Sequence, residues 1–381
     1  MEPLKPQPSA KPTQGASQVS GKNRATRHWH WHLFCQVIDN WGDIGVTWRL
    51  ATDLAQRGQT VTVWLDDKRA LAWMAPQGAP GVQVADWPAQ ANEAVWAAGG
   101  AHWPEAPTVV VEMFGCHLPP AVERHLADIA HAPQPHPLVW LNLEYLSAEP
   151  HVQGLHRLPS PVMSGPAAGL TKWFFYPGFR ANTGGLIHPH REATGAHGAQ
   201  NNSGDVCSLF CYPSPAIATW LSAWQTAGGC VAVWPGAGAD AVRSMGVSGV
   251  EYRRAVSQTE FDMHLRLSLF NVVRGEDSLA QALWSGRPLL WHIYPQSDGA
   301  HLDKLEAFLD WAEAPAVVRR AHHIWNGPFD QLESSQTDWV ATPFSPDWPE
   351  WLAWAKRVRE KAEAIPNLTL SLLDFVEERT A

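Results

Sequence analysis

The chain has 381 residues, a length that suits two domains better than one. Apolar residues make up 45% of it and charged residues 17%, which excludes a wholly disordered protein. The formal net charge is −9 at pH 7, so the broad basic surface of a general nucleic-acid-binding protein is not expected.

The cysteines are odd in number and scattered, which argues against a disulfide framework and for a reducing compartment, the cytoplasm. Cys207 and Cys211 lie close together, but no second Cys/His pair at zinc spacing follows them, so no structural metal site is expected. No apolar run is long enough to span a bilayer. Residues 1–28 are rich in Pro, Ser, Gln and Lys, and we expect them to form a disordered extension rather than a signal peptide.

The first half of the chain has the pattern of an α/β domain. An apolar run over 31–38 is followed by a glycine-containing turn, a helical pattern that ends at Gly58, and a second apolar run over 60–65. Further strands are predicted at 108–113 and 138–143, with a helix over 120–131 between them. These elements predict a doubly wound, Rossmann-like domain over 29–185.

A second α/β series follows an interdomain linker, which we place at 186–205 because this segment is rich in Gly, Asn and His. The second domain is predicted over 206–365, with strands at 206–210, 230–234, 269–273 and 288–293 and helices at 216–225, 260–267, 278–284 and 300–311. Two terminal helices are predicted at 347–363 and 368–378. Two such domains indicate a ligand in a central cleft, beside residues that directly follow strands.

The first such segment is DNWGDIG, residues 39–45, after the first strand. Its glycines allow close approach of a ligand to the backbone, and Asp39 and Asp43 bring two carboxylates to the cleft. A carboxylate would repel a phosphate and suits a base acting on an acceptor. The alternative is that Asp39 or Asp43 only caps the following helix.

The second segment is RGEDS, residues 274–278, between a strand and a helix. Ser278 and the backbone amides of the helix start form an anion site, and Arg274 adds a planar cation suited to a diphosphate. Glu276 could accept hydrogen bonds from sugar hydroxyls. The alternative is an ordinary helix cap with a surface Arg–Glu pair.

The third feature consists of aromatic and amide side chains near strand ends, which could stack on a nucleobase and read its edge: Phe210, Tyr212, Gln258, Phe261 and Tyr294. The alternative is that these rings belong to the core, because the chain has 22 Trp and 12 Phe.

At these segments the chain resembles the EarP family, the protein-arginine rhamnosyltransferases of bacterial translation elongation factor P. The matching stretches occur in both predicted domains, from about residue 33 to about residue 310. They are DNWGDIGVTWRLATDLAQRG (39–58), WLNLEYLSAE (140–149), FFYPGF (174–179), TGGL (183–186), SLFCYP (208–213), LFNVVRGEDSLAQALWSGRPLLWHIYPQ (269–296), then His301 and KLEAFL (304–309). Trp41 stands where this family is expected to have Phe or Tyr.

The resemblance implies a GT-B fold, two Rossmann-like domains facing a central cleft, with a C-terminal helix (366–381) joined to the first domain. It implies transfer of L-rhamnose from dTDP-β-L-rhamnose to an arginine of elongation factor P, by inverting displacement without metal or cofactor. Carried over residue by residue, Asp43 becomes the general base, Asp39 supports it and Glu276 engages the donor. The diphosphate and nucleotide would be held by Arg274, Asp277, Ser278, Phe210, Tyr212, Gln258, Phe261 and Tyr294.

Two other functions stay open at this stage. One is a GT-B transferase with a different nucleotide sugar or acceptor, and the other is a nucleotide-binding module without catalysis. A degenerate module would be expected to lose Asp43 or Glu276, and the chain retains both. This favours an enzyme.

Overall fold

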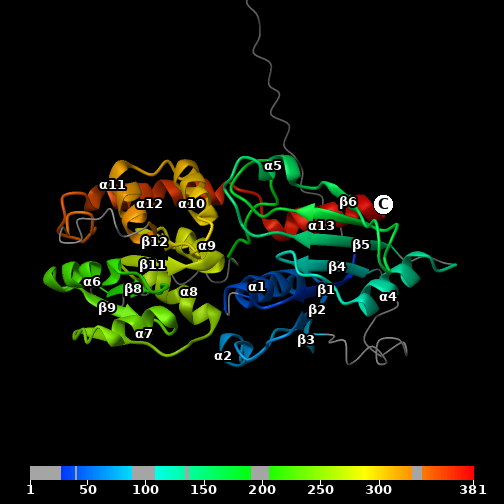
Figure 1. The fold of residues 1–381 in the computed structure, drawn as a ribbon, viewed down its shortest axis with the longest axis horizontal. Coiled ribbons are helices and arrows are strands. Elements are labelled where there is room, and N and C mark those ends of the chain that lie inside the picture. The colour runs from blue at the N-terminus through cyan, green and yellow to red at the C-terminus, as the bar shows by residue number, and fades with distance from the viewer. Residues whose placement is uncertain (1–26, 39–40, 88–107, 134–136, 190–205, 328–336) are drawn as a thin grey trace, which may run out of the picture.

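The computed structural model describes residues 27–38, 41–87, 108–133, 137–189, 206–327 and 337–381. The chain forms two α/β domains side by side, with helices α1 and α9 at their boundary (Figure 1). The predicted extension (1–28) and linker (186–205) lie mostly outside these residues, which include only 27–28 of the extension and 186–189 of the linker.

The first domain is built on a seven-stranded sheet in the order β3-β2-β1-β4-β5-β7-β6, parallel except for β6. Its strands are β1 His30–Cys35, β2 Thr60–Leu65, β3 Val82–Asp86, β4 Thr108–Met113, β5 Leu138–Leu143, β6 Pro159–Pro161 and β7 Thr171–Phe175. Its helices are α1 Gly42–Gln56, α2 Leu71–Met74, α4 Pro120–Ala130 and α5 Val152–Leu155. Every residue of β1 is buried, as expected for an apolar strand covered on both faces.

The second domain has a five-stranded parallel sheet in the order β10-β9-β8-β11-β12. Its strands are β8 Val206–Leu209, β9 Cys230–Val233, β10 Val250–Tyr252, β11 Phe270–Arg274 and β12 Leu289–His292. Its helices are α6 Ala216–Thr226, α7 Ala237–Ser244, α8 Gln258–Leu267, α9 Gly275–Ser285, α10 Ala300–Trp311, α11 Ala316–Asn326 and α12 Trp348–Glu363. The core of this domain contains many of the tryptophans, including Trp220, Trp224, Trp291, Trp325, Trp351 and Trp354.

The last helix, α13 (Leu368–Thr380), leaves the second domain and packs on the first (Figure 1). Leu372, Phe375 and Val376 are buried in the core of the first domain, together with side chains of β1, β2, β4 and β5. The crossing is fixed by backbone bonds from Leu186 N–H to the Pro366 carbonyl (3.0 Å) and from Leu368 N–H to the Leu186 carbonyl (2.8 Å).

The strand-to-helix junction at β11 and α9 differs from the prediction. Helix α9 begins at Gly275, directly after the strand, whereas the sequence predicts a start at residue 278. Gly275 has a φ of 67°, a left-handed conformation that glycine adopts without strain, so the chain turns from strand to helix within one residue. As a result the whole RGEDS segment lies at the strand end and in the first helical turn.

Candidate active site

Two adjoining pockets lie between the domains and share Gly42, Gly275 and Glu276. They contain about 640 and 840 Å³ of empty space, which includes space open to solvent. The first pocket is lined mainly by the second domain, and the second is lined by both domains. They are called here the aromatic pocket and the central pocket.

Arg274 lies at the wall of the aromatic pocket, at the end of β11, and is 8% exposed. Its guanidinium carbon lies 4.6 Å from the ring centre of Phe210, 4.7 Å from that of Tyr212 and 5.6 Å from that of Trp41. These rings hold a planar cation by cation–π contacts. The alternative of an Arg–Glu surface pair is wrong, because Arg274 is buried among aromatic rings.

His292, at the end of β12, pairs in register with Arg274. Burial, with a further contribution from Arg274, lowers the pKa of His292 to about 3, so its ring is neutral. The neutral ring accepts a hydrogen bond from the Tyr212 backbone N–H at its Nδ1 (3.2 Å). The buried His292 ring beside Arg274 is therefore neutral and does not repel the Arg274 guanidinium.

Aromatic rings in contact with one another form part of the wall of the aromatic pocket. Phe261 lies edge-on to Phe210, with ring centres 5.4 Å apart, and Trp41 stacks on Phe210 at 6.2 Å. Gln258 and Ser278 line the same pocket. Tyr294 instead lines the central pocket, where it is half-exposed and edge-on to Tyr212 at 5.5 Å.

Asp43 lies in the first turn of α1, lines the central pocket and is 3% exposed. Its Oδ2 accepts a hydrogen bond from the Ile38 backbone N–H (2.8 Å), which ties the carboxylate to the end of the preceding loop. The alternative of a helix cap is wrong for Asp43, because Trp41 occupies the N-cap position and makes no side-chain cap bond. Asp39 lies outside the described residues.

Glu276 connects the two pockets and the two domains. Its Oε1 lies 2.6 Å from Lys304 Nζ, and its Oε2 accepts a hydrogen bond from the Leu146 backbone N–H (2.7 Å) in the first domain. Burial raises the pKa of Glu276, and the positive charge of Lys304 acts against that rise. The carboxylate is thus oriented by one ion pair and one backbone donor.

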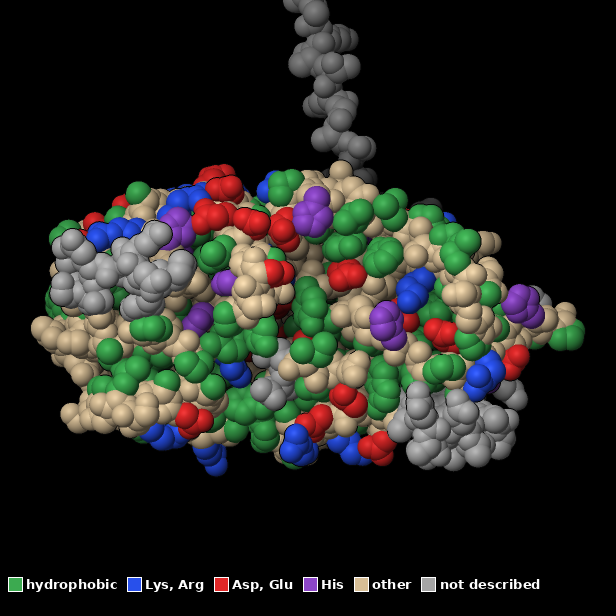
Figure 2. Space-filling view, viewed as in Figure 1, with side chains coloured by type: hydrophobic (Ala, Val, Ile, Leu, Met, Phe, Trp, Pro, Cys, Tyr) green, Lys and Arg blue, Asp and Glu red, His purple; other side chains and the backbone are tan. Residues whose placement is uncertain are grey.

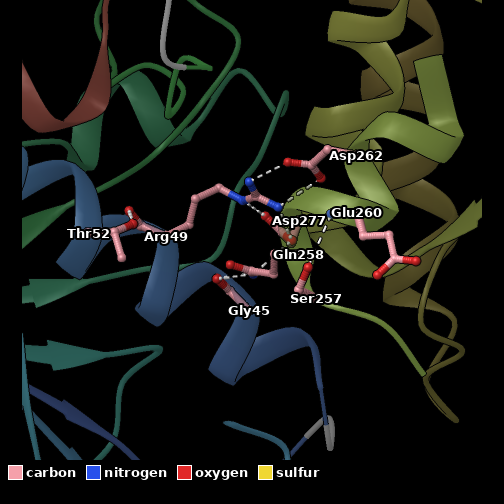
Figure 3. Close-up of polar contacts among 8 residues, drawn as sticks. All are labelled: Gly45, Arg49, Thr52, Ser257, Gln258, Glu260, Asp262 and Asp277. Carbon is pink, nitrogen blue, oxygen red and sulfur yellow. Dashed lines mark hydrogen bonds and ion pairs between the residues drawn. The ribbon is translucent and has the colours of Figure 1, made fainter. Parts of the chain in front are cut away.

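Asp277 lines the aromatic pocket, but its carboxylate is bound to a cation of the other domain. Arg49 of α1 donates from Nε to Asp277 Oδ1 (2.6 Å) and from Nη2 to Oδ2 (3.0 Å), and it also bonds Asp262 of α8 (Figure 3). Gln258 reaches in the opposite direction, and its amide donates to the Gly45 carbonyl (2.9 Å). The sequence prediction included neither Arg49 nor Asp262.

One sequence signal could have pointed to Arg49. It stands four residues after Gly45, so both lie on the same face of α1. A glycine on that face indicates close approach of another element, and an arginine beside it needs an anionic partner there. Lys304 was also not assigned, although it lies within a stretch that resembles the family.

Some classes of site are absent from the residues that the structure describes. In those residues no group of three or more His, Cys, Asp or Glu side chains is arranged to hold a metal ion. No helix in the same part of the chain combines the length and apolar character needed to cross a membrane.

The surface carries charges of both signs. On the face seen in Figure 2, acidic side chains gather over α10, and acidic and basic side chains alternate along the opposite edge.

Comparisons with known proteins identify relatives that match both domains. The family model described as "Elongation-Factor P (EF-P) rhamnosyltransferase EarP" matches residues 31–377. A protein-arginine rhamnosyltransferase of Pseudomonas putida is 38% identical, over 91% of this chain and 98% of that protein. Enzymes of the same name from Pseudomonas aeruginosa and Neisseria meningitidis are 34% and 33% identical, over 91% and 87% of this chain and 98% and 95% of theirs.

Solved structures show the same architecture. A structure described as the basis for EarP-mediated arginine glycosylation of translation elongation factor EF-P has 25% identity and a TM-score of 0.57, and the match covers 92% of this chain and 99% of that one. The spinosyn rhamnosyltransferase SpnG shares the fold at 15% identity, with a TM-score of 0.53 over 92% of this chain and 99% of that one. The predicted GT-B fold is confirmed. The chain belongs to the EarP family and is a glycosyltransferase.

Proposed function

We propose that this enzyme transfers L-rhamnose from dTDP-β-L-rhamnose to an arginine side chain of translation elongation factor P, with inversion at the sugar carbon. The observation that carries the proposal is the meeting of two unlike pockets at Glu276. One has a buried cation, Arg274, among aromatic rings, and the other has a buried carboxylate, Asp43. The names of the relatives supply the sugar and the acceptor class.

The aromatic pocket suits the nucleotide end of the donor. Phe210 and Phe261 offer flat faces and edges for a thymine base, and Gln258 offers an amide at the same wall. Arg274, Ser278 and the first-turn amides of α9 form an anion site for the diphosphate. Arg274, rather than a divalent cation, would supply the positive charge as dTDP departs.

The central pocket suits the acceptor. A guanidinium has a pKa above about 12 and is a poor nucleophile, so it must lose a proton as it reacts. The guanidinium nitrogen attacks the anomeric carbon and forms a C–N bond, while the C–O bond to the diphosphate breaks and its electrons leave with dTDP. Asp43 accepts the proton from the attacking nitrogen, acting as general base. No enzyme nucleophile takes part, so the configuration inverts.

Glu276 lies where the sugar would join the two halves of the site, and its carboxylate can accept hydrogen bonds from rhamnose hydroxyls. Asp39 is proposed to support Asp43, as the family resemblance implies. Because the acceptor is a translation factor, we place the reaction in the cytoplasm.

The test is intact-mass analysis of elongation factor P from the same organism, after incubation with the enzyme and dTDP-β-L-rhamnose. We expect one deoxyhexose on one arginine, and none with the Asp43→Asn variant. Binding of dTDP without any transfer would contradict the proposed sugar or acceptor and favour a different GT-B transferase. Absence of dTDP binding as well would contradict the proposed donor and favour a different nucleotide sugar.

A further inference from the structure

Arg49 forms a four-bond contact between the domains. Besides its two bonds to Asp277, it donates from Nη1 to Asp262 Oδ2 (2.8 Å) and from Nη2 to Asp262 Oδ1 (3.1 Å). The side chains of Arg49, Asp262 and Asp277 are only 16%, 13% and 15% exposed. In the sequence, Arg49 lies more than 200 residues from either partner. Figure 3 shows the guanidinium of α1 held between the carboxylates of α8 and α9.

The two carboxylates of this cluster belong to the second domain, and the cation that binds both of them comes from the first. Burial raises the pKa of Asp262, Arg49 acts against that rise, and the neighbouring Asp277 adds to it. Burial lowers the pKa of Arg49, but the two carboxylates more than offset this and raise it. Without Arg49, two carboxylates of the second domain would repel each other in a nearly dry position.

The contact joins two helices that carry opposite parts of the proposed machinery. Helix α1 carries Asp43 six residues before Arg49, and the first turn of α9 carries Glu276 and Ser278. The helices approach closely at Gly45, where an added Cβ would lie 3.3 Å from Gln258 Nε2 and 3.4 Å from Asp277 Oδ2. The Arg49 contact therefore sets how far the carboxylate of one domain stands from the anion site of the other.

We propose that Arg49 is a positioning residue that closes the cleft: by binding Asp262 and Asp277 it sets the distance between Asp43, which acts on the acceptor, and the donor site of the second domain, without touching either substrate. The inference rests on the proposed function, in which Asp43 acts on the acceptor. It also gives Asp277 a role through Arg49, in place of the direct diphosphate contact that the family resemblance implies. Asp262 lines neither pocket, so its part in this contact can be tested apart from ligand binding.

The test compares Arg49→Met and Asp262→Asn with a matched control, Arg57→Met. Arg57 directly follows α1 and pairs with Asp53 of that helix (3.1 Å). For each variant, kcat, the KM for dTDP-β-L-rhamnose and the Kd for dTDP are measured. The distance between one dye on α4 and one on α7 is followed by energy transfer, with and without dTDP.

For Arg49→Met we expect kcat to fall about 100-fold, as a displacement of about 1 Å can produce, while the KM and Kd of the donor change less than about threefold. The distance between the dyes on α4 and α7 should be longer in Arg49→Met than in the wild type. The Arg49→Met/Asp262→Asn double variant should be no slower than Arg49→Met alone, because both changes break one contact. Arg49→Lys should recover part of kcat, and Arg57→Met should match the wild type.

A kcat within about twofold of the wild type in Arg49→Met would overturn the inference, as would an unchanged dye separation in a variant that has lost kcat. The two proposals fail separately. If the wild type does not modify elongation factor P, the proposed function fails. The dye separation in Arg49→Met still decides whether Arg49 closes the cleft, because that readout needs no transfer.

Discussion

Lys304 Nζ lies 2.6 Å from Glu276 Oε1, which makes Lys304 of α10 the cation that faces the carboxylate at the junction of the two pockets. Glu144 of the first domain is nearby, and its pKa is raised by burial and further by the charge of Glu276, while Lys304 acts against the rise. Lys304 thus offsets the repulsion between carboxylates contributed by two domains.

The first prediction concerns the pH dependence of activity. Removal of the positive charge in Lys304→Met favours the protonated form of Glu276, so its pKa rises further. We expect the acid limb of the kcat/KM profile to move to higher pH by about one unit or more. The control is Lys361→Met, which removes a lysine bound to the exposed Glu313 at 2.8 Å. An acid limb that stays in place would show that the profile does not report Glu276.

The second prediction concerns the base. Asp43→Asn retains the size of the side chain but cannot accept a proton, so we expect transfer to fall at least about 100-fold. The dTDP affinity should stay near that of the wild type, because Asp43 lines the central pocket and not the aromatic pocket. Asp66→Asn is a suitable control, since Asp66 also accepts a bond from a backbone N–H near this loop, that of Val37 (2.9 Å). A loss of dTDP binding in Asp43→Asn would contradict the assignment.

The third prediction concerns the anion site. Arg274→Ala removes a buried cation and the charge-assisted hydrogen bonds that it is proposed to donate to the diphosphate, so we expect the Kd for dTDP to rise by about 10- to 100-fold, measured by calorimetry. Arg243→Ala provides a matched control, because Arg243 lies 4.5 Å over the ring of Tyr252 but outside both pockets. Equal affinities in the wild type and Arg274→Ala would remove Arg274 from the donor site.

The fourth prediction concerns stability in acid. His322 is fully buried, its Nε2 accepts from the Trp291 N–H (3.1 Å), and burial lowers its pKa from 6.5 to about 4. The unfolded chain takes up a proton below pH 6.5, whereas the folded one does not until about pH 4. The stabilising contribution is therefore complete above pH 6.5 and is lost as the pH falls toward 4, at about 1.4 kcal/mol per pH unit.

Urea unfolding between pH 7.5 and 4.5 tests this prediction. The free energy of unfolding should fall with pH more gradually in His322→Gln than in the wild type, because one titrating group is gone. The exposed His131 offers a control, and His131→Gln should leave the slope unchanged. Equal slopes in the wild type and His322→Gln would contradict the assignment.

Strands buried on both faces could be predicted closely from the sequence. The bounds of β2, β4 and β5 match the predicted runs, because a continuous apolar run is itself the signature of a covered strand. The edge strands β3 and β10 were missed, since their outward side chains are exposed and break that run. Helix α7 was missed too, because it has only 8 residues and its apolar side chains are mostly those of alanine.

The residues of the candidate site that directly follow strands could be predicted from the sequence. The contacts that depend on how the two domains meet could not. Asp43 and Arg274 could be proposed because residues after parallel strands collect at one edge of a sheet. The bonds from Arg49 to Asp262 and Asp277 join residues more than 200 positions apart. Nothing local in the sequence specifies that juxtaposition, which appears only when two separately folded sheets are placed face to face.

The return of α13 to the first domain has a consequence for the order of assembly. Leu372, Phe375 and Val376 are synthesised after the second domain, yet they complete the core of the first domain. During synthesis the apolar face of the first domain that α13 covers stays exposed until α13 has been made, whereas the second domain can already pack its own core. A stop codon before residue 368 would therefore damage the amino-terminal half of the enzyme, far from the break in sequence.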